Sequence, residues 1–425
     1  MIYAGCGRTW HLARGQAARG TSPWTGRTSP VDKPHVAHGT LHVARLIRMR
    51  DSSIALLRDL VAIDSVNPSL VAGAAGEGAI GDAIAHHLRR LGLDVTLQEV
   101  VPGRRNVIGV LEGSERGRSL MLCGHMDTVG VEGMSAPFDP VERDGRLYGR
   151  GAQDMKGGLA AMIDAARLAH DRGFRKGRLI VAAVIDEEYA SIGADALARG
   201  WGADAAVVTE PTDLQVGVAH KGFAWVEIQA HGRAAHGSRP ADGRDAILRM
   251  GRILHRLEQL DRGLQSRTAH PLMGVASLHA STIAGGREWS SYPDVCTVRL
   301  ERRTIGDETG DTFLGEIETI LSDLRNEDPD FAAEATLRFA RPAYEVPKND
   351  PLPGALAHAA KALGVAAEPV GMSFWTDAAI LGSAGIPSVL FGPGGAGLHS
   401  RDEYVRVADV IACRDVLAAF SMTYL

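Results

Sequence analysis

Cysteine is scarce in this sequence of 425 residues. The four cysteines, Cys6, Cys123, Cys296 and Cys413, are far apart and form no CxxC pair. This distribution argues against a disulfide framework and against a zinc site built from thiolates. It is typical of proteins from a reducing compartment, and we therefore expect a cytoplasmic protein.

Long apolar runs and clusters of positive charge are also missing. No stretch approaches the roughly 18 consecutive apolar residues of a membrane span. The formal net charge is −5, and no basic stripe alternates with aromatic residues, so we expect neither a membrane nor a nucleic acid as partner. A composition of 45% hydrophobic and 23% charged residues describes a globular protein. The length favours two domains over one core.

Residues 1–50 differ in composition from the rest of the chain. They carry several arginines, one acid (Asp32), and glycine, serine, threonine and proline without periodicity. No apolar core of roughly 7–15 residues follows the first basic residues, which argues against a secretory signal. A transit peptide would fit the basic composition. We favour a disordered extension, or a start assigned upstream of the true one at Met49, and exclude this segment from the predicted fold.

From Asp51 the pattern becomes regular. A cap and helical spacing begin there, and apolar runs at 119–127, 179–188 and 205–211 alternate with helical patterns such as 154–170. This alternation predicts an α/β fold with a mixed, largely parallel sheet between helices. We assign residues 51–216 to the first part of this layer.

Residues 217–336 show a different order of elements. Alternating strands and amphipathic helices follow one another as β-α-β-β-α-β, which predicts a small α+β sandwich inserted into the larger domain. The α/β pattern resumes over residues 337–425, which form the second part of the larger domain.

Reactive side chains follow four of the predicted strands. His125 lies at the end of the first run, Glu187 and Glu188 at the end of the second, and Glu210 at the end of the third. His399 lies in a glycine-rich loop beyond a fourth apolar run at 387–391. Ligands of open α/β sheets bind beyond the carboxyl ends of the strands. If these strands share one sheet, the side chains meet at one rim.

Asp154 adds a carboxylate from the glycine-rich segment 149–158. Two histidines and three carboxylates exceed one tetrahedral site and divide into two metal sites with a shared ligand. Ligands of this kind without thiolates favour catalytic Zn²⁺, with Co²⁺ or Mn²⁺ as alternatives. Asp127 shares a face with His125 and can accept a hydrogen bond from its other ring nitrogen. One more carboxylate must stay off the metals to take a proton from water.

Each candidate also has an ordinary structural explanation. Asp154 can simply cap the helix that begins after it. Glu210 can be a solvated loop acid, and His125 can be a hydrogen-bonded core histidine. Only the joint occurrence of the candidates at consecutive strand ends favours the metal site.

Five motifs occur in order between Asp51 and Leu425: GHMDTV, GRGAQDMKGG, VIDEE, TEP and GPGGAGLHSRDEYV. Together they resemble the two-metal aminoacylase family, which includes acetylornithine deacetylase, succinyl-diaminopimelate desuccinylase, aminoacylase and carboxypeptidase G. The resemblance implies a phosphorylase/hydrolase-like catalytic domain with an inserted ferredoxin-like lid domain. It also implies a homodimer formed through residues 217–336.

The resemblance further implies a metal-binding role for five residues. His125 and Glu210 would hold one ion, Glu188 and His399 the other, and Asp154 would bridge the two. These implied ligands are the four residues of the strand-end pattern together with Asp154 of the glycine-rich segment.

Other roles come from the resemblance as well. Glu187 would be the general base that deprotonates the metal-bound water and then protonates the leaving nitrogen, while Asp127 would orient His125. In GRAAHGSRP, His236 would stabilise the tetrahedral oxyanion, usually by reaching across to the partner subunit. In LERRTIGDE, Arg303 would bind the substrate carboxylate, with an exposed ion pair as the alternative.

Three further positions are candidates for a role near the predicted substrate site. Ser290 stands where the family often has asparagine, so a substrate contact at that position is not carried over. Glycines within 392–397 would form a backbone wall for the substrate. Asp186, the first acid of VIDEE, is expected to be structural, holding the loop through backbone amides.

The predicted function is therefore metal-dependent hydrolysis of an amide bond, with an N-acyl amino acid as substrate. A dipeptidase or carboxypeptidase of the same family is the alternative within the enzyme class. A protein that binds metal and amino-acid derivatives without turnover is the alternative from another class. Glu187 and His236 disfavour it, because a mere binding protein needs neither.

Overall fold

The structure is a computed structural model that describes residues 51–425. The predicted extension, residues 1–50, lies outside the described residues. Among the helices of residues 51–425, none combines the length and the apolar character needed to cross a bilayer.

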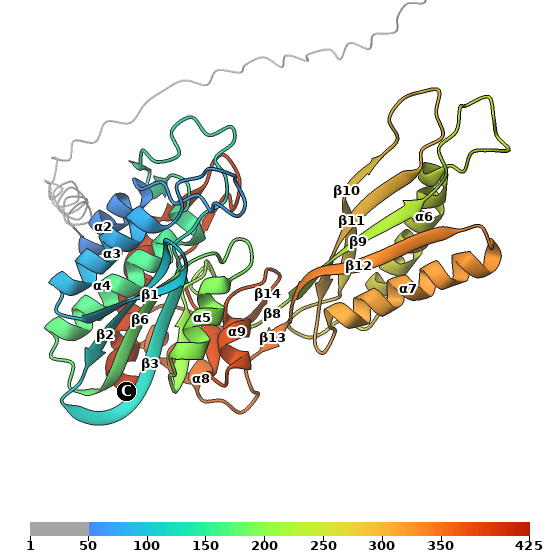
Figure 1. The fold of residues 1–425 in the computed structure, drawn as a ribbon. Helices are drawn as coiled ribbons and strands as arrows, with labels where there is room; N and C mark the ends of the chain where they lie inside the picture. Colours follow the sequence, from blue (N-terminus) through green and yellow to red (C-terminus); the bar gives the residue numbers. More distant parts are fainter. Residues whose placement is uncertain (1–50) are drawn as a thin grey trace, which may run out of the picture. The chain divides into compact units, whose positions relative to one another are not determined.

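A nine-stranded mixed sheet forms the larger layer (Figure 1). Its strands lie in the order β1-β2-β6-β3-β7-β15-β8-β13, and β14 pairs with β8. The central strands β6, β3, β7 and β15 are parallel, while both flanks contain antiparallel pairs. The predicted mixed α/β sheet is confirmed. The strand bounds are β1 Asp94–Val101, β2 Arg104–Glu112, β3 Glu115–His125, β6 Lys176–Val184, β7 Ala205–Val208, β8 Val216–His220, β13 Tyr344–Glu345, β14 Pro369–Met372 and β15 Ser388–Leu390.

Helices cover both faces of this sheet. One face packs on α2 Ser52–Val61, α3 Gly78–Arg90, α4 Gly157–Asp171, α8 Leu352–Ala362 and α10 Val407–Tyr424. The other face packs on α5 Ile192–Gly200 and α9 Ala378–Ser383. In β3, Leu120 and Leu122 join the first core, and Met121 and Cys123 join the second. Burial on both sides explains why the central strands are continuous apolar runs in the sequence.

A second, four-stranded antiparallel sheet occupies residues 222–341, which we call the inserted layer. Its elements are β9 Gly222–His231, α6 Ala246–Gln265, β10 Ser277–Gly285, β11 Val295–Thr304, α7 Gly310–Glu327 and β12 Ala332–Arg341, and its strand order is β10-β11-β9-β12. Both helices lie on one face of this sheet (Figure 1). The element order is the predicted one. The strand before it, β8, pairs within the large sheet, so the second sheet begins at Gly222. The division into domains at 217–336 stays a prediction.

A small sheet that the sequence patterns did not indicate joins two distant loops. It consists of β4 Val141–Arg143, β5 Arg146–Tyr148, β16 Gly395–Ala396 and β17 Tyr404–Arg406, in the order β16-β17-β5-β4. A five-residue π-helical turn, η1 Ala152–Lys156, follows β5 and leads into α4. The pairing of β5 with β17 brings the segment around Asp154 close to the loop that carries His399.

Candidate metal centre and substrate cavity

The predicted ligands come together at one edge of the large sheet. His125 is the last residue of β3, and Glu188 and Glu210 lie in the loops after β6 and β7. His399 lies between β16 and β17, in the segment that follows β15. The strands β6, β3, β7 and β15 are adjacent and parallel, so their carboxyl ends lie side by side. The turn η1 adds Asp154 to the group.

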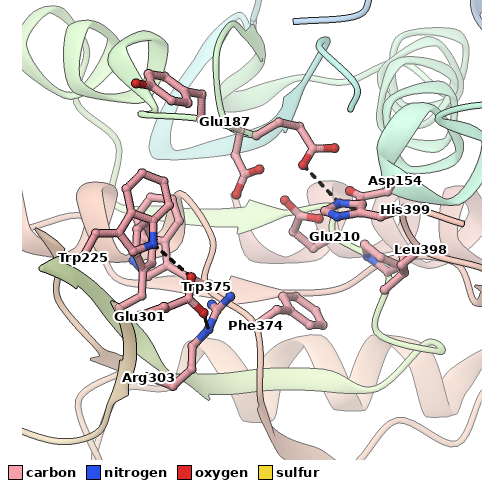
Figure 2. A pocket seen from close by; sticks show the side chains of 14 residues that line it. Asp154, Glu187, Glu210, Trp225, Glu301, Arg303, Phe374, Trp375, Leu398 and His399 are labelled. Carbon is pink, nitrogen blue, oxygen red and sulfur yellow. Dashed lines mark hydrogen bonds and ion pairs between the residues drawn. The ribbon is translucent and has the colours of Figure 1, made fainter. Parts of the chain in front are cut away.

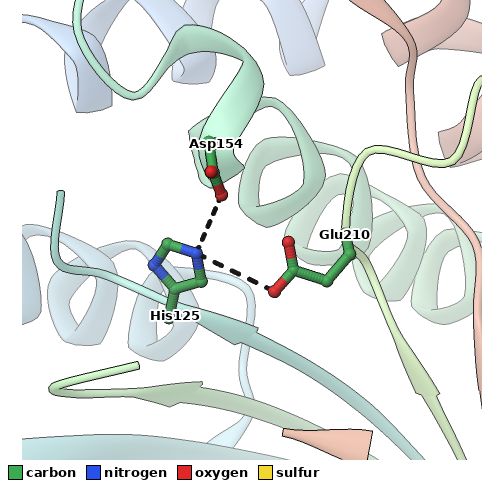
Figure 3. A group of neighbouring side chains, drawn as sticks. All are labelled: His125, Asp154 and Glu210. Atoms are coloured by element: carbon green, nitrogen blue, oxygen red, sulfur yellow. Dashed lines mark hydrogen bonds and ion pairs between the residues drawn. The ribbon is translucent and has the colours of Figure 1, made fainter. Parts of the chain in front are cut away.

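Asp154 stands between two histidines. Its Oδ1 lies 3.1 Å from Nε2 of His125, and its Oδ2 lies 3.3 Å from Nε2 of His399. The Oε1 of Glu210 is 3.8 Å from Nε2 of His125 (Figure 3). The Oε2 of Glu188 is 3.1 Å from Nε2 of His399. The residues thus form two groups, each able to hold a metal ion, that share Asp154.

Two polar atoms show that this donor set fits a cation. The Nδ1 of His125 lies 2.9 Å from the backbone carbonyl of Asp127. Because a carbonyl oxygen only accepts, Nδ1 carries a proton, and Nε2, which faces Asp154 and Glu210, is the ring nitrogen that can bind a metal. The Oε1 of Glu188 is buried without a hydrogen-bond partner among residues 51–425. A ring nitrogen available in one ligand group and an unpartnered carboxylate oxygen in the other are what two metal ions would need.

The three glutamates of the site lie in an environment that disfavours their ionised form. Burial raises the pKa of Glu188 to about 7, and it raises the pKa values of Glu187 and Glu210 well above their usual range. Hydrogen bonds to the carboxylates of Asp154 and Glu188 raise the pKa of His399 to about 10. Acids that repel one another in a buried place are stabilised when cations lie between them.

Asp127 is placed differently from the prediction. Its carboxylate lies 3.6 Å from Nδ1 of His125, whereas its backbone carbonyl makes the hydrogen bond to that ring. The two carboxylate oxygens accept instead from the backbone N–H groups of Glu187 and Glu188, each at 3.1 Å, and from Asn67 at 2.8 Å. Asp127 therefore holds the backbone of the two glutamates, and its main chain orients the histidine.

Asp186 lies beside the site and contacts neither group of ligands. Its Oδ1 accepts from Arg104 at 2.9 Å, Ser69 at 3.0 Å and Asn67 at 3.2 Å. Its backbone carbonyl accepts from the N–H of Ser191 at 2.6 Å, and its φ of 69° lies in the left-handed region. The tight turn after β6 is thus closed by the main chain of Asp186, while its side chain ties the turn to β2.

The turn that carries Asp154 is held by a residue that sequence reasoning missed. Glu403 accepts through Oε1 from the N–H groups of Gln153 and Asp154, and through Oε2 from Gly151 and Arg150. Asp154 does not cap α4, since that helix begins at Gly157 without a side-chain cap. Glu403 belongs to the quoted HSRDEYV motif, so its position after His399 was the available signal.

Lys156, the last residue of η1, bonds to the main chain of a distant segment. Its Nζ donates to the backbone carbonyl of Ile63 at 2.8 Å and lies over the ring of Phe138. Burial lowers the pKa of Lys156 to about 7. The residue therefore fastens η1 to the end of α2.

A cavity of about 320 Å³ extends from the metal ligands to the inserted layer (Figure 2). One part of its wall is acidic and includes Glu187 and four of the five predicted ligands, namely Asp154, Glu188, Glu210 and His399. The facing part is aromatic and carries one ion pair. Its residues are Tyr189, Phe223, Trp225, Glu301, Arg303, Phe374, Trp375 and Leu398.

The remaining predicted residues fall in different places. Arg303 lines the cavity, as a substrate-binding residue must. His236 does not line it; the residue lies exposed in a loop of the inserted layer, with Nδ1 2.8 Å from the hydroxyl of Ser238. The glycines of 392–397 are not lining residues either. A Cβ on Gly392 would lie 2.2 Å from the backbone oxygen of Glu210, so this glycine permits close packing behind a ligand.

Comparison with known proteins identifies the family. The sequence model of peptidase family M20/M25/M40 matches residues 121–423, which include every predicted metal ligand. The chain belongs to this family. The predicted resemblance is confirmed, and the chain is a hydrolase of a metal-dependent family. The alternative of a binding protein without turnover is not supported.

Two curated relatives act on acylated amines. N-formyl-4-amino-5-aminomethyl-2-methylpyrimidine deformylase of Bacillus subtilis is 30% identical over 377 residues, covering 80% of this chain and 88% of that protein. Acetylornithine deacetylase of Myxococcus xanthus is 35% identical over 334 residues, covering 74% and 82%. The chain is thus related to enzymes that cleave amide bonds.

Solved structures of two peptidases share the fold. A tripeptidase from Staphylococcus aureus superposes with a TM-score of 0.75 at 21% identity, covering 88% of this chain and 98% of that one. The dipeptidase Dug1p from Saccharomyces cerevisiae gives a TM-score of 0.72 at 14% identity, covering 91% and 98%. At these identities the likeness establishes the architecture.

Proposed function

We propose that this enzyme removes the acyl group from N-acyl amino acids at a centre of two divalent metal ions. The observation that carries the proposal is the position of Asp154, whose two oxygens face two separate histidines, each with its own glutamate. The relationship to a deacetylase and a deformylase supports acyl removal.

Five residues would hold the ions. His125 and Glu210 belong to one group and Glu188 and His399 to the other, with Asp154 in both. Zinc suits ligands of this kind best, and cobalt or manganese are the alternatives. When bound, the two ions would acidify a water molecule and polarise the scissile carbonyl.

Glu187 supplies the proton transfers. It stands outside both ligand groups, its Oε2 lies 3.8 Å from Nε2 of His125, and it lines the cavity. Burial raises the pKa of Glu187, which makes its carboxylate a stronger base. It takes the proton of the attacking water and delivers it to the leaving nitrogen. The carboxylate of Asp127 holds Glu187 in place by accepting from the backbone N–H of Glu187.

His236 and Arg303 bind the substrate. Arg303 lines the cavity and binds the carboxylate of the substrate's amino acid moiety. His236 acts in the cavity of a second copy, where its ring donates a hydrogen bond to the developing oxyanion. This role requires a homodimer formed through residues 217–336. Exposed apolar side chains of the inserted layer support such an interface: Ile247, Leu248, Ile283 and Trp289.

The protein would work in the cytoplasm. Cys123, Cys296 and Cys413 are buried and free, as expected of a reducing compartment.

A hydrolysis panel tests the proposal. Metal-free protein is reloaded with Zn²⁺, Co²⁺ or Mn²⁺ and assayed with N-acetyl, N-succinyl, N-formyl and N-carbamoyl amino acids and with dipeptides. We expect metal-dependent release of free amino acid from at least one N-acyl series. Faster hydrolysis of dipeptides would favour the alternative, a dipeptidase or carboxypeptidase, and an inactive metal-loaded protein would refute the proposal.

A further inference from the structure

The open face of the inserted layer forms one wall of the cavity. In the antiparallel pair β9–β11, Trp225 lies opposite Glu301 and Phe223 lies opposite Arg303. Residues that lie opposite one another in such a pair project from the same face of the sheet. The neighbouring residues Val226 and Leu300 belong to the core beneath α6 and α7, so these four side chains lie on the face without helices.

Arg303 is held at one edge and on one face of its guanidinium. Its Nε donates to Oε1 of Glu301 at 2.7 Å, and the group lies over the ring of Phe223, 5.6 Å from its centre. Glu301 is itself fixed, because its Oε2 accepts from the indole Nε1 of Trp225 at 2.9 Å (Figure 2). A side chain with several rotatable bonds thus has its plane set by two neighbours.

The other edge of the guanidinium is free. No residue within 51–425 accepts a hydrogen bond from Nη1 or Nη2 of Arg303. The side chain lines the cavity and is 33% exposed. Both oxygens of Glu301, by contrast, are already engaged. This part of the wall therefore offers two parallel N–H donors, and a carboxylate is the group that matches them.

We propose that Glu301, supported by Trp225, is a positioning residue that fixes the plane of Arg303 and thereby selects substrates by where their carboxylate stands. The inference rests on the proposed deacylation and narrows its substrate class to N-acyl α-amino acids. A mobile arginine side chain can bind carboxylates at several distances from the scissile amide. A fixed one binds only a carboxylate at one distance from that amide.

Three substrates that differ in one group test the inference. N-acetyl-L-alanine carries the carboxylate one carbon from the amide nitrogen, N-acetyl-β-alanine carries it one methylene farther, and N-acetyl-L-alaninamide has none. We expect kcat/KM of the wild type to favour the first over each of the others by roughly tenfold or more, mainly through KM. Glu301→Gln removes the charge that holds Nε and should reduce the preference for the α- over the β-compound to about twofold.

Glu227→Gln is the matched control. Glu227 also pairs with two arginines, Arg299 and Arg338, on the open face of the same sheet, but it does not line the cavity. Its replacement should leave the ratio of the α- to the β-compound unchanged. Trp225→Phe keeps an aromatic ring and loses the indole donor, so it should lower the ratio in the same direction as Glu301→Gln.

The outcomes separate the inference from the proposed function. An unchanged α-to-β ratio in folded Glu301→Gln protein, or an equal loss in Glu227→Gln, would overturn the positioning role. Hydrolysis of none of the three substrates by metal-loaded wild type would count against the proposed function instead. In that case the dissociation constants of the same three compounds, measured with metal-loaded wild type and Glu301→Gln, give the ratio without turnover.

Discussion

Glu187 and Glu188 are neighbours in the chain but face different surroundings. Their N–H groups are bound by the two oxygens of Asp127. The side chain of Glu188 reaches His399, whereas that of Glu187 stays outside both ligand groups. One fixed stretch of backbone thereby gives two adjacent acids different surroundings, which permits the separate tasks proposed for them.

Glu187→Gln tests the division between these two tasks. The amide keeps the shape of the side chain but is not a base, so we expect kcat to fall by about 10²-fold or more. The metal content, measured by atomic emission, should stay at the wild-type level. Glu188→Gln is the comparison, and it should lose metal as well as activity. Activity of Glu187→Gln close to wild type would refute the assignment of the base.

His220, the last residue of β8, is a buried histidine outside the metal centre. Its Nδ1 lies 3.0 Å from the backbone carbonyl of Lys221, and its Nε2 has no partner within residues 51–425. Burial lowers the pKa of His220 from 6.5 to about 4. In the unfolded chain His220 becomes protonated below about pH 6.5, whereas in the folded chain it stays neutral down to about pH 4.

This difference predicts a pH dependence of stability. Stability contributed by neutral His220 is present above its unfolded pKa and is lost as the pH falls, by about 2 kcal/mol between pH 7 and pH 5. His220→Asn keeps an N–H donor near Lys221 but does not titrate. Between pH 7 and pH 5 its free energy of unfolding should fall by about 2 kcal/mol less than that of the wild type. Denaturant unfolding at both pH values measures the difference. His86→Asn, at an exposed position, is the control, and equal pH slopes for His220→Asn and wild type would contradict the prediction.

The loops that carry the ligands depend on contacts between distant elements. Glu403 binds the turn η1 across 249 residues of sequence, and the small sheet of β5 and β17 joins the same segments. Gly392, after β15, packs against the main chain of Glu210. Each ligand therefore depends on a neighbouring loop as well as on its own strand.

Gly392→Ala tests this dependence. The new Cβ would stand 2.2 Å from the backbone oxygen of Glu210, so one of the two segments must shift. We expect weaker metal binding by about tenfold, a size typical of disturbed supporting contacts around a metal. Competition with a chromophoric chelator measures the affinity. Gly354→Ala, where a Cβ meets nothing within 4 Å, should bind metal like the wild type, and equal affinities of the two variants would contradict the account.

The sequence predicted the elements better than their side-chain partners, for physical reasons. Apolar runs buried on both faces indicate central strands, and parallel strands bring their ends together. Four of the five candidate ligands could therefore be placed at one edge of the sheet. The strands of the small sheet are only two or three residues long and carry no periodicity. The hydrogen bonds of Asp127 and Glu403 depend on tertiary approach of loops, which no local pattern records.

At the scale of the whole molecule, the position of His236 sets a requirement. The residue lies exposed and away from the cavity of its own chain. If it contributes to catalysis from a partner, each site is built from two copies. In that case only the dimer is catalytically active.

Mixing two inactive variants tests this arrangement. In a heterodimer of Glu187→Gln and His236→Ala, one site receives an intact Glu187 and an intact His236. Random exchange of subunits should restore about one quarter of the wild-type activity. The assay compares the mixture, after subunit exchange, with each variant alone. No recovery in a mixture shown to contain heterodimers would contradict catalysis across the interface.

The central claim is a centre of two ions that share Asp154. The most direct test strips the protein with a chelator and titrates Zn²⁺ back while the bound metal and the hydrolysis of the best substrate of the panel are measured together. The account predicts negligible activity without metal and full activity only at two ions per chain, one for each ligand group. Full activity at one ion per chain, or activity that persists in the stripped protein, would contradict it.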